Sequence, residues 1–236
     1  MGTATVVTPG VPDVILVMQA HPDDADISSG ASIARWCREG ARVIAISCTS
    51  GEAGRSEPPV SPTELGAMRE QEQRDAAVVL GVTDVRFLHL PDGGLMHTSE
   101  LEHQLVDLIV EARPGRLVTH DPWAKGEHHP DHLQAGRAAL AALIAADRAG
   151  WRVPEVYLFR SDEPNTAVDV EDTFSLKLRA VEQHRSQRSI GEAPPAAIES
   201  WATRAGERWG MRMAETFTVL TFEQCQERSE ALERLT

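Results

Sequence analysis

The sequence has little cysteine and few basic residues. Its three cysteines, Cys37, Cys48 and Cys225, lie far apart and form no CxxC pair, so neither a disulfide framework nor a zinc ribbon can be recognised. Lys and Arg number 23 against 36 Asp and Glu, the net charge is −13, and no basic run occurs. This charge argues against a nucleic-acid or anionic-membrane surface, and we expect a small-molecule substrate instead.

Long apolar segments and targeting signals are also missing. The longest apolar runs, residues 14–18 and 138–146, are too short to cross a membrane. The first residues lack the basic and then apolar order of a signal peptide. With the cysteine usage, these features predict a cytoplasmic protein without a membrane span and leave a homo-oligomer open.

Length and hydrophobic content are sufficient for a core. Of 236 residues, 42% are hydrophobic, and a chain of this size needs neither disulfides nor a structural metal for stability. We therefore expect one domain over residues 1–236, in which any metal serves function.

Short β-branched runs alternate with helical patterns along the chain. Strands are predicted at residues 14–18, 41–48, 85–90 and 116–120, and helices follow at about 28–38, 63–80, 99–111 and 131–148. Later strands are expected at 155–160 and near 167–170, with helices at about 172–184 and 195–213, while residues 216–220 form either a last strand or a packed tail. Four successive βα units predict an α/β fold, a Rossmann-like three-layer sandwich with a mainly parallel central sheet.

Polar clusters follow the first four predicted strands. They are AHPDDAD (20–26), CTSGEAGR (48–55), LPDGG (90–94) and THDPWAKGEHHPDH (119–132). The carboxyl ends of parallel strands meet at one sheet edge, where ligands bind, so we expect the functional site there. Neither GxGxxG after the first strand nor GxxxxGK(S/T) occurs, which removes the main support for NAD or ATP binding.

The first cluster places His21, Asp23 and Asp24 in one turn. An imidazole close to two carboxylates can form a metal site with a spare base. The alternative is a strand-to-helix turn in which the aspartates cap the helix and His21 is incidental.

The second cluster contains His128, His129, Asp131 and His132. His129 and His132 are three residues apart and would project from the same helical face. Three histidines within five positions, beside a carboxylate and at the same sheet edge as the first cluster, favour a metal site. Two imidazoles and one carboxylate suit zinc and leave a position open for water, as in catalytic zinc sites.

With these motifs the chain resembles the PIG-L/LmbE-like de-N-acetylases, zinc hydrolases that include N-acetylglucosaminyl-phosphatidylinositol de-N-acetylase and deacetylases of the mycothiol and bacillithiol pathways. The resemblance covers about residues 14–217. AHPDDAD is similar to the family's AHPDDxE, TSGEAG to its TxGExG, and HPDH to its second metal motif. KLRAVEQHRSQ (177–187) is similar to the family's K-x-x-A-x-x-x-H-x-S-Q helix.

The resemblance implies a zinc ion on His21, Asp24 and His132, with Asp23 as general base. His129 would be the electrophilic partner or acid. Asp131 would orient or charge His129, although a first-turn helix cap is an equal alternative for Asp131.

Arg69 and Asp92 resemble positions that hold sugar hydroxyls or phosphate in relatives; the alternative is a structural ion pair between loops. The implied function is zinc-dependent hydrolysis of an N-acyl bond, expected to be N-acetyl, on an amino sugar or sugar-bearing metabolite. Two alternatives stay open. One is a hydratase or other lyase of the same superfamily, and the other is a non-catalytic metal-binding regulatory domain.

The chain departs from the family pattern at three places, one of which is ISSGAS (27–32), where the family usually has a glycine-rich stretch. Asp26 stands where the family has Glu, so any bond made by that side chain must be rebuilt. The tyrosine that some deacetylases carry before HPDH is missing, and oxyanion stabilisation is expected from zinc and protonated His129, or from Lys125.

Overall fold

A seven-stranded sheet forms the centre of the molecule. The computed structural model describes residues 10–190 and 194–233. The strands are β1 (Val14–Gln19), β2 (Arg42–Thr49), β3 (Asp84–Leu90), β4 (Arg116–His120), β5 (Glu155–Phe159), β6 (Thr166–Asp169) and β7 (Ala214–Thr221). The helices are α1 (Asp24–Arg38), α2 (Pro62–Leu80), α3 (Ser99–Ala112), α4 (Pro130–Arg148), α5 (Phe174–Val181), η1 (Arg185–Ile190), α6 (Pro195–Trp209) and α7 (Phe222–Glu233).

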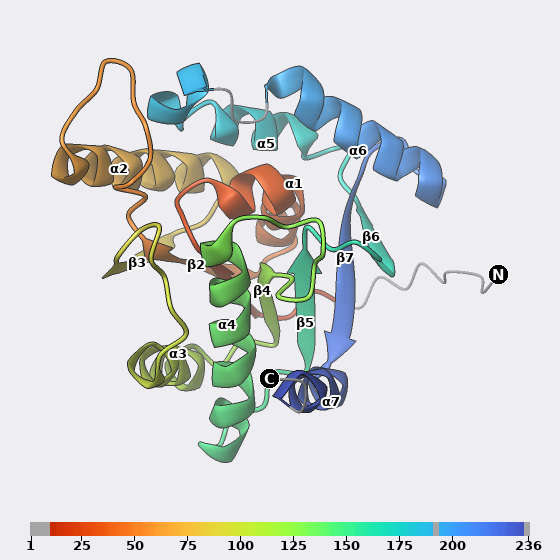
Figure 1. Cartoon of the computed structure of the whole chain (residues 1–236). Helices are drawn as coiled ribbons and strands as arrows, with labels where there is room; N and C mark the ends of the chain where they lie inside the picture. Colours follow the sequence, from red (N-terminus) through yellow and green to blue (C-terminus); the bar gives the residue numbers. More distant parts are fainter. Residues whose placement is uncertain (1–9, 191–193, 234–236) are drawn as a thin grey trace.

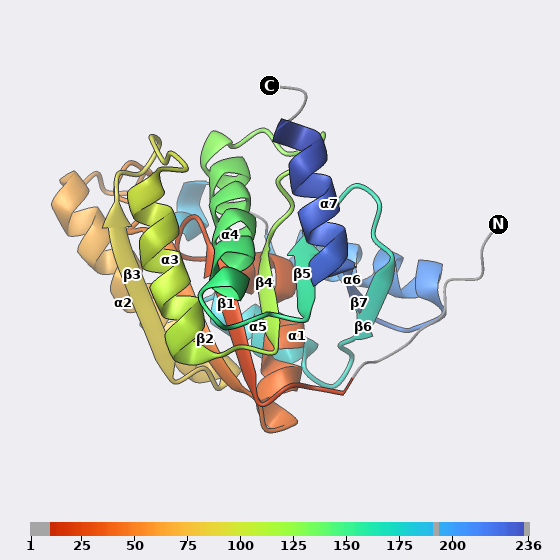
Figure 2. The same ribbon diagram turned by 90° about the horizontal axis from the view of Figure 1, so that it is seen from below.

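The strands run in the order β3-β2-β1-β4-β5-β7-β6. The first five are parallel, whereas β7 pairs antiparallel with both β5 and β6. Helices α1, α2, α5 and α6 cover one face, and α3, α4 and α7 cover the other (Figures 1 and 2). This confirms the predicted α/β fold with a single, mostly parallel sheet flanked by helices.

Alternate residues of β1 reach two separate cores. Leu16 and Met18 pack with the helices on the α4 side, while Ile15 and Val17 pack on the α1 side. A strand buried on both faces reads as a continuous apolar run, which is why the sequence predicted it well.

Helix ends and the last elements differ from expectation. α1 begins at Asp24 rather than near residue 28, so the HPDD turn leads directly into the helix. α6 ends at Trp209 because Gly210 adopts a left-handed φ of 72° at the cap. Residues 216–220 belong to strand β7, and α7 was not predicted. No helix of the described residues is long and apolar enough to cross a membrane.

Neighbouring strands β1 and β4 define the point where the strand order reverses. α1 follows β1 on one face and α4 follows β4 on the other (Figure 1), and in open α/β sheets ligands bind at such a point, beyond the carboxyl ends of the strands. Gly136 of α4 allows a close approach, since a Cβ there would lie 2.6 Å from the carbonyl oxygen of His120. The first half of α4 is thereby brought close to the end of β4, the neighbour of β1 in the sheet.

A buried ion pair links the inserted strand β7 to α1. Non-helical Ser29 (φ −142°) interrupts α1. The carboxylate of Glu215 accepts hydrogen bonds from the backbone N–H groups of Ala31 (3.2 Å) and Ser32 (2.7 Å), and Lys177 Nζ pairs with it at 2.5 Å. The pair caps the second half of α1 and fixes the helix that carries the first polar cluster.

Candidate active site

A cavity of about 950 Å³ lies at the carboxyl ends of the central strands. Its lining includes seven of the eight predicted site residues: His21, Asp23, Asp24, Arg69, Asp92, His129 and His132. The eighth, Asp131, lies beside the lining, with Oδ2 3.3 Å from His21 Nε2. Four segments that are distant in sequence are therefore brought to one place.

Asp23 occupies an unusual backbone conformation in the β1–α1 turn. Its φ is 95°, a left-handed value that is rare for residues other than glycine and is often found at functional sites. Its backbone N–H donates to Gln73 Oε1 at 2.9 Å, and its carboxylate accepts from Arg69 at 3.1 Å. The turn therefore holds this carboxylate at the cavity surface.

Arg69 organises the loop that follows β2. The buried guanidinium donates to the carbonyl oxygens of Gly51 (3.0 Å) and Pro22 (2.8 Å) as well as to Asp23. Gly51 has a φ of 69°, and a Cβ on it would lie 2.4 Å from the guanidinium carbon, so the TSGEAG motif needs glycine here. Among the described residues, the ion pair with Asp92 that was the structural alternative is not formed.

The Asp24 carboxylate is buried among imidazoles. Its oxygens lie 3.0 Å from His132 Nε2, 3.3 Å from His120 Nε2 and 3.4 Å from His21 Nδ1. Burial raises the pKa of Asp24, but attraction from His132 and His120 outweighs burial and holds the pKa well below its usual value. Asp24 is therefore an anion at neutral pH.

The Nδ1 atom of His132, whose Nε2 contacts Asp24, lies beside a carboxylate that was not predicted from the sequence. Glu127 Oε2 lies 2.9 Å from His132 Nδ1 and 3.3 Å from Arg160. Burial raises the pKa of Glu127, but the backbone N–H of His129 and the His132 ring outweigh burial and lower the pKa to about 2. The only sequence signal was an acidic residue just before the HHPDH motif.

Two carboxylates contact the Nε2 atom of His21, whose Nδ1 faces Asp24. Nε2 lies 3.0 Å from Asp92 Oδ1 and 3.3 Å from Asp131 Oδ2. Burial lowers the pKa of His21, but Asp131, Asp24 and Asp92 together raise it far above its usual value. Asp92 also accepts the N–H of Ala53 at 2.8 Å, which joins two loops of the cavity.

The Asp131 carboxylate contacts His21 and accepts the backbone N–H groups of Gly93 (2.8 Å) and Leu95 (3.1 Å). Asp131 thus fixes the loop after β3 against the start of α4. Its negative charge also raises the pKa of His129, and the role of orienting or charging that ring stays a prediction.

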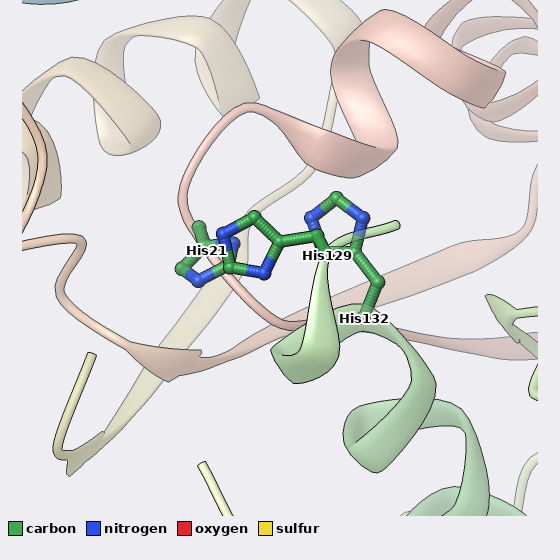
Figure 3. Close-up of side chains that lie close together, drawn as sticks. All are labelled: His21, His129 and His132. Atoms are coloured by element: carbon green, nitrogen blue, oxygen red, sulfur yellow. The ribbon is translucent and has the colours of Figure 1, made fainter. Parts of the chain in front are cut away.

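His129 is the N-cap residue of α4, and its Nδ1 accepts the backbone N–H of Asp131 at 3.3 Å. Its ring stacks on His132, with centroids 4.6 Å apart, and meets the edge of His21 at the same distance (Figure 3). Burial lowers the pKa of His129 and the charges on His21 and His132 lower it further, while Asp131 and Asp24 raise it, and the net direction is downward. The protonated His129 expected from the sequence stays a prediction. With Nδ1 accepting, the proton of neutral His129 is assigned to Nε2. Lys125, the other candidate, is exposed and does not line the cavity.

Three overlapping sets of donor atoms in the described residues could hold a metal ion. They are His21–His129–His132, Asp24–His120–His132 and His21–Asp92–Asp131. The predicted ligands His21, Asp24 and His132 are distributed over these sets.

The contacts of the predicted ligands fit a bound metal. His21 and His132 each direct one nitrogen to Asp24 and the other to a different carboxylate, an arrangement that orients metal-ligating imidazoles in proteins. The side chains present therefore fit a divalent cation.

Fold and site together define a class of α/β proteins in which a His/Asp metal-binding group lies at the sheet's switch point. The model of the GlcNAc-PI de-N-acetylase family, PIG-L, matches residues 16–143, and the chain belongs to this family. The family predicted from HPDD and HPDH is thus confirmed.

Individual relatives are deacetylases. The chain is 31% identical to diacetylchitobiose deacetylase of Thermococcus kodakarensis, over 85% of this chain and 80% of the relative. It is 39% identical to 1D-myo-inositol 2-acetamido-2-deoxy-alpha-D-glucopyranoside deacetylase of Streptomyces avermitilis, over 64% of this chain and 62% of the relative. The solved N,N'-diacetylchitobiose deacetylase from Pyrococcus horikoshii superposes with a TM-score of 0.81 at 28% identity, covering 89% of this chain and 84% of that one. The predicted enzyme class, a deacetylase, is confirmed.

Replacing Glu127 tests its contact with the Nδ1 atom of His132. We expect Glu127→Gln to weaken the binding of a divalent metal ion about 10- to 100-fold, because an amide orients the imidazole less strongly than a carboxylate. Competition with a chromophoric chelator measures the affinity. The control is Glu57→Gln, which changes another residue of the cavity wall that contacts no imidazole in the described part of the chain. Equal affinities of the two variants would contradict the assignment.

Proposed function

We propose that this protein is a zinc-dependent deacetylase that hydrolyses the N-acetyl group of an amino sugar or a sugar-bearing metabolite. One observation carries the proposal: the Asp23 carboxylate, oriented by Arg69, shares a cavity with imidazoles and carboxylates that could hold a metal ion. Deacetylation of amino sugars by the named relatives supports the choice of substrate class.

His21, Asp24 and His132 would hold the zinc ion. Zinc at this position supplies Lewis acidity, which acidifies water and polarises an acyl oxygen. Neutral imidazoles and an ionised carboxylate are ligands that zinc prefers, and Asp24 is already anionic in this structure.

Asp23 is proposed as the general base. Its carboxylate accepts a proton from the attacking water as oxygen bonds to the acyl carbon, and it returns the proton to the nitrogen as the C–N bond breaks. Acetate and a free amine leave. The Nε2–H of His129 donates to the acyl oxygen while negative charge develops there, which gives this imidazole the role of stabilising the oxyanion.

Substrate contacts are proposed for Arg69 and Asp92. Both line the cavity, next to the proposed base and to His21 respectively. Since the guanidinium already binds Pro22, Gly51 and Asp23, its effect on substrate is exerted mainly through its charge.

Other features are proposed with the function. The strand order and the helices on both faces support a Rossmann-like three-layer sandwich formed by one domain over residues 1–236. The free cysteines support a cytoplasmic location.

Acetate release from a panel of N-acetylated sugars tests the function directly. The purified protein is expected to contain about one zinc ion per chain, to release acetate, and to lose activity on chelation. An active protein without a transition metal would overturn the mechanism. Hydration of a double bond, or zinc binding without turnover, would favour the two alternatives raised by the sequence.

Substitution of the adjacent aspartates separates base from ligand. Asp23→Asn is expected to retain zinc and to lower kcat roughly 10²- to 10⁴-fold, the usual contribution of general base catalysis. Asp24→Asn is expected to lose zinc, because the amide removes the anion between the imidazoles. Metal content and kcat are measured on both variants, so each serves as the control of the other. The reverse pattern would exchange the two roles.

Alanine substitutions of the three histidines in the second cluster are expected to differ in their effects on zinc content and on kcat. His129→Ala should retain zinc and lose roughly 10²- to 10³-fold in kcat, as when an oxyanion donor is removed. His132→Ala should lose zinc. The exposed neighbour provides the control, and His128→Ala is expected to leave both zinc content and kcat near those of the wild type. Loss of zinc from His129→Ala would instead make His129 a ligand.

A further inference from the structure

A buried network of hydrogen bonds connects the turn of Asp23 with the residue before η1. The backbone N–H of Asp23 donates to Gln73 Oε1 at 2.9 Å, and Gln73 Nε2 donates to Asp26 Oδ2 at 3.0 Å. Asp26 Oδ2 in turn lies 2.8 Å from His184 Nε2. Gln73, Asp26 and His184 are buried, and none of the three belongs to the lining of the cavity. The network therefore reaches the proposed base from the protein side.

The partners of Gln73 determine which way its amide points. An amide oxygen and an amide nitrogen occupy nearly the same space, so their hydrogen-bond partners decide between the two orientations. The Asp26 carboxylate accepts, which requires the NH2 group on its side. The oxygen is then left for the backbone N–H of Asp23, which can only donate. The reverse orientation would leave both contacts unpaired, which is costly for buried groups.

A second amide, that of Gln19, fits the same orientation. Gln19 Oε1 accepts the backbone N–H of Ala25 at 2.8 Å, so its NH2 group lies at the opposite end. Gln19 Nε2 donates from there to Gln73 Oε1 at 2.9 Å. The oxygen of Gln73 thus has two donors, and its nitrogen depends on Asp26.

His184 occupies the far end of the network. Its Nδ1 has no hydrogen-bond partner in the described part of the chain, so the bond to Asp26 is the one its ring makes there. The segment that follows is anchored separately, because the backbone N–H and the hydroxyl of Ser186 donate to Glu72 of α2 at 2.8 and 2.7 Å. Replacing the imidazole therefore removes the bond to Asp26 and leaves this anchor of η1 in place.

We propose that Asp26 and His184 are positioning residues for the general base. They hold the Gln73 amide with its oxygen toward the backbone of Asp23, and this bond maintains the left-handed conformation (φ 95°) of that residue. The inference rests on the proposed function, in which Asp23 accepts the proton of the attacking water. Since both residues lie outside the cavity lining, we expect them to act on kcat and not on the binding of substrate or metal.

Substitutions at His184 and Asp26 test the effect on the reaction. His184→Leu is expected to lower kcat about 10- to 100-fold with KM and metal content nearly unchanged, because small displacements of a catalytic group have effects of this size. His184→Gln keeps an N–H donor for Asp26 and should recover most of kcat. Asp26→Asn keeps the size of the side chain but can donate as well as accept, so it should also lower kcat, and it replaces His184→Leu if that variant does not fold.

Thr173→Val is the matched control. The Thr173 hydroxyl donates to the carbonyl oxygen of Ala31 in α1 at 2.8 Å, a buried bond that does not involve Gln73. Loss of this bond should leave kcat near that of the wild type. A decrease in kcat as large as that of His184→Leu would show a general structural effect and would overturn the proposal.

A double-mutant cycle determines whether His184 acts through Asp23. The base is already missing in Asp23→Asn, so adding His184→Leu to it is expected to leave kcat unchanged. A further decrease equal to the one in the wild-type background would overturn the proposal.

Hydrogen exchange at the backbone N–H of Asp23 tests the network without any activity. Measured by NMR, exchange is expected to be about 3- to 10-fold faster in His184→Leu and Asp26→Asn than in the wild type and Thr173→Val, the effect of weakening one hydrogen bond. Equal rates in all four proteins would overturn the proposal. If no acetylated sugar is hydrolysed but exchange at Asp23 still responds, the deacetylase function fails and the positioning network stands.

Discussion

The buried carboxylate of Asp24 is the contact on which the site depends. It touches imidazoles from three places in the fold: His21 after β1, His120 at the end of β4, and His132 in the first turn of α4. Burying an anion is costly unless opposite charge or hydrogen-bond donors surround it. The close approach of α4 to β4 at Gly136 provides that surrounding, and the same geometry creates a place for a cation. The packing of α4 against the sheet therefore also brings the residues of the site together.

Much of this could be predicted because it follows from local pattern and from sheet topology. Apolar runs buried on both faces predict parallel strands, and the carboxyl ends of such strands meet at one edge, so the HPDD and HPDH motifs had to converge. The structure of the last residues was harder to predict from the sequence. Strand β7 inserts antiparallel between β5 and β6, and its partners are set by long-range pairing that residues 216–220 do not encode. Helix α7 was missed because, of its first four residues, only Phe222 and Cys225 are buried.

Side-chain direction at the start of α4 could not be derived from spacing. Helical periodicity correctly brought His129 and His132 together, but it does not say which segment lies opposite each side chain. The Asp131 carboxylate accepts the backbone N–H groups of Gly93 and Leu95 in the loop after β3, a long-range partner that the spacing of the motif does not identify. Glu127 was missed for the same reason. Its role comes from its contact with His132, and no motif marks it.

Two adjacent carboxylates can serve different tasks because the backbone turns sharply between them. Asp23 has a left-handed φ of 95°, and the two buried side chains have different partners: Asp23 contacts Arg69, whereas Asp24 lies among imidazoles. Such a conformation costs of order 1–3 kcal/mol, and the hydrogen bond from the Asp23 N–H to Gln73 offsets part of that cost. The other end of Gln73 donates to Asp26 at 3.0 Å, and Asp26 in turn lies 2.8 Å from His184 Nε2. Asp26, which replaces the family's glutamate, is therefore long enough to connect Gln73 with His184. Gln73 is held in place by this contact and accepts the backbone N–H of Asp23 in the strained turn.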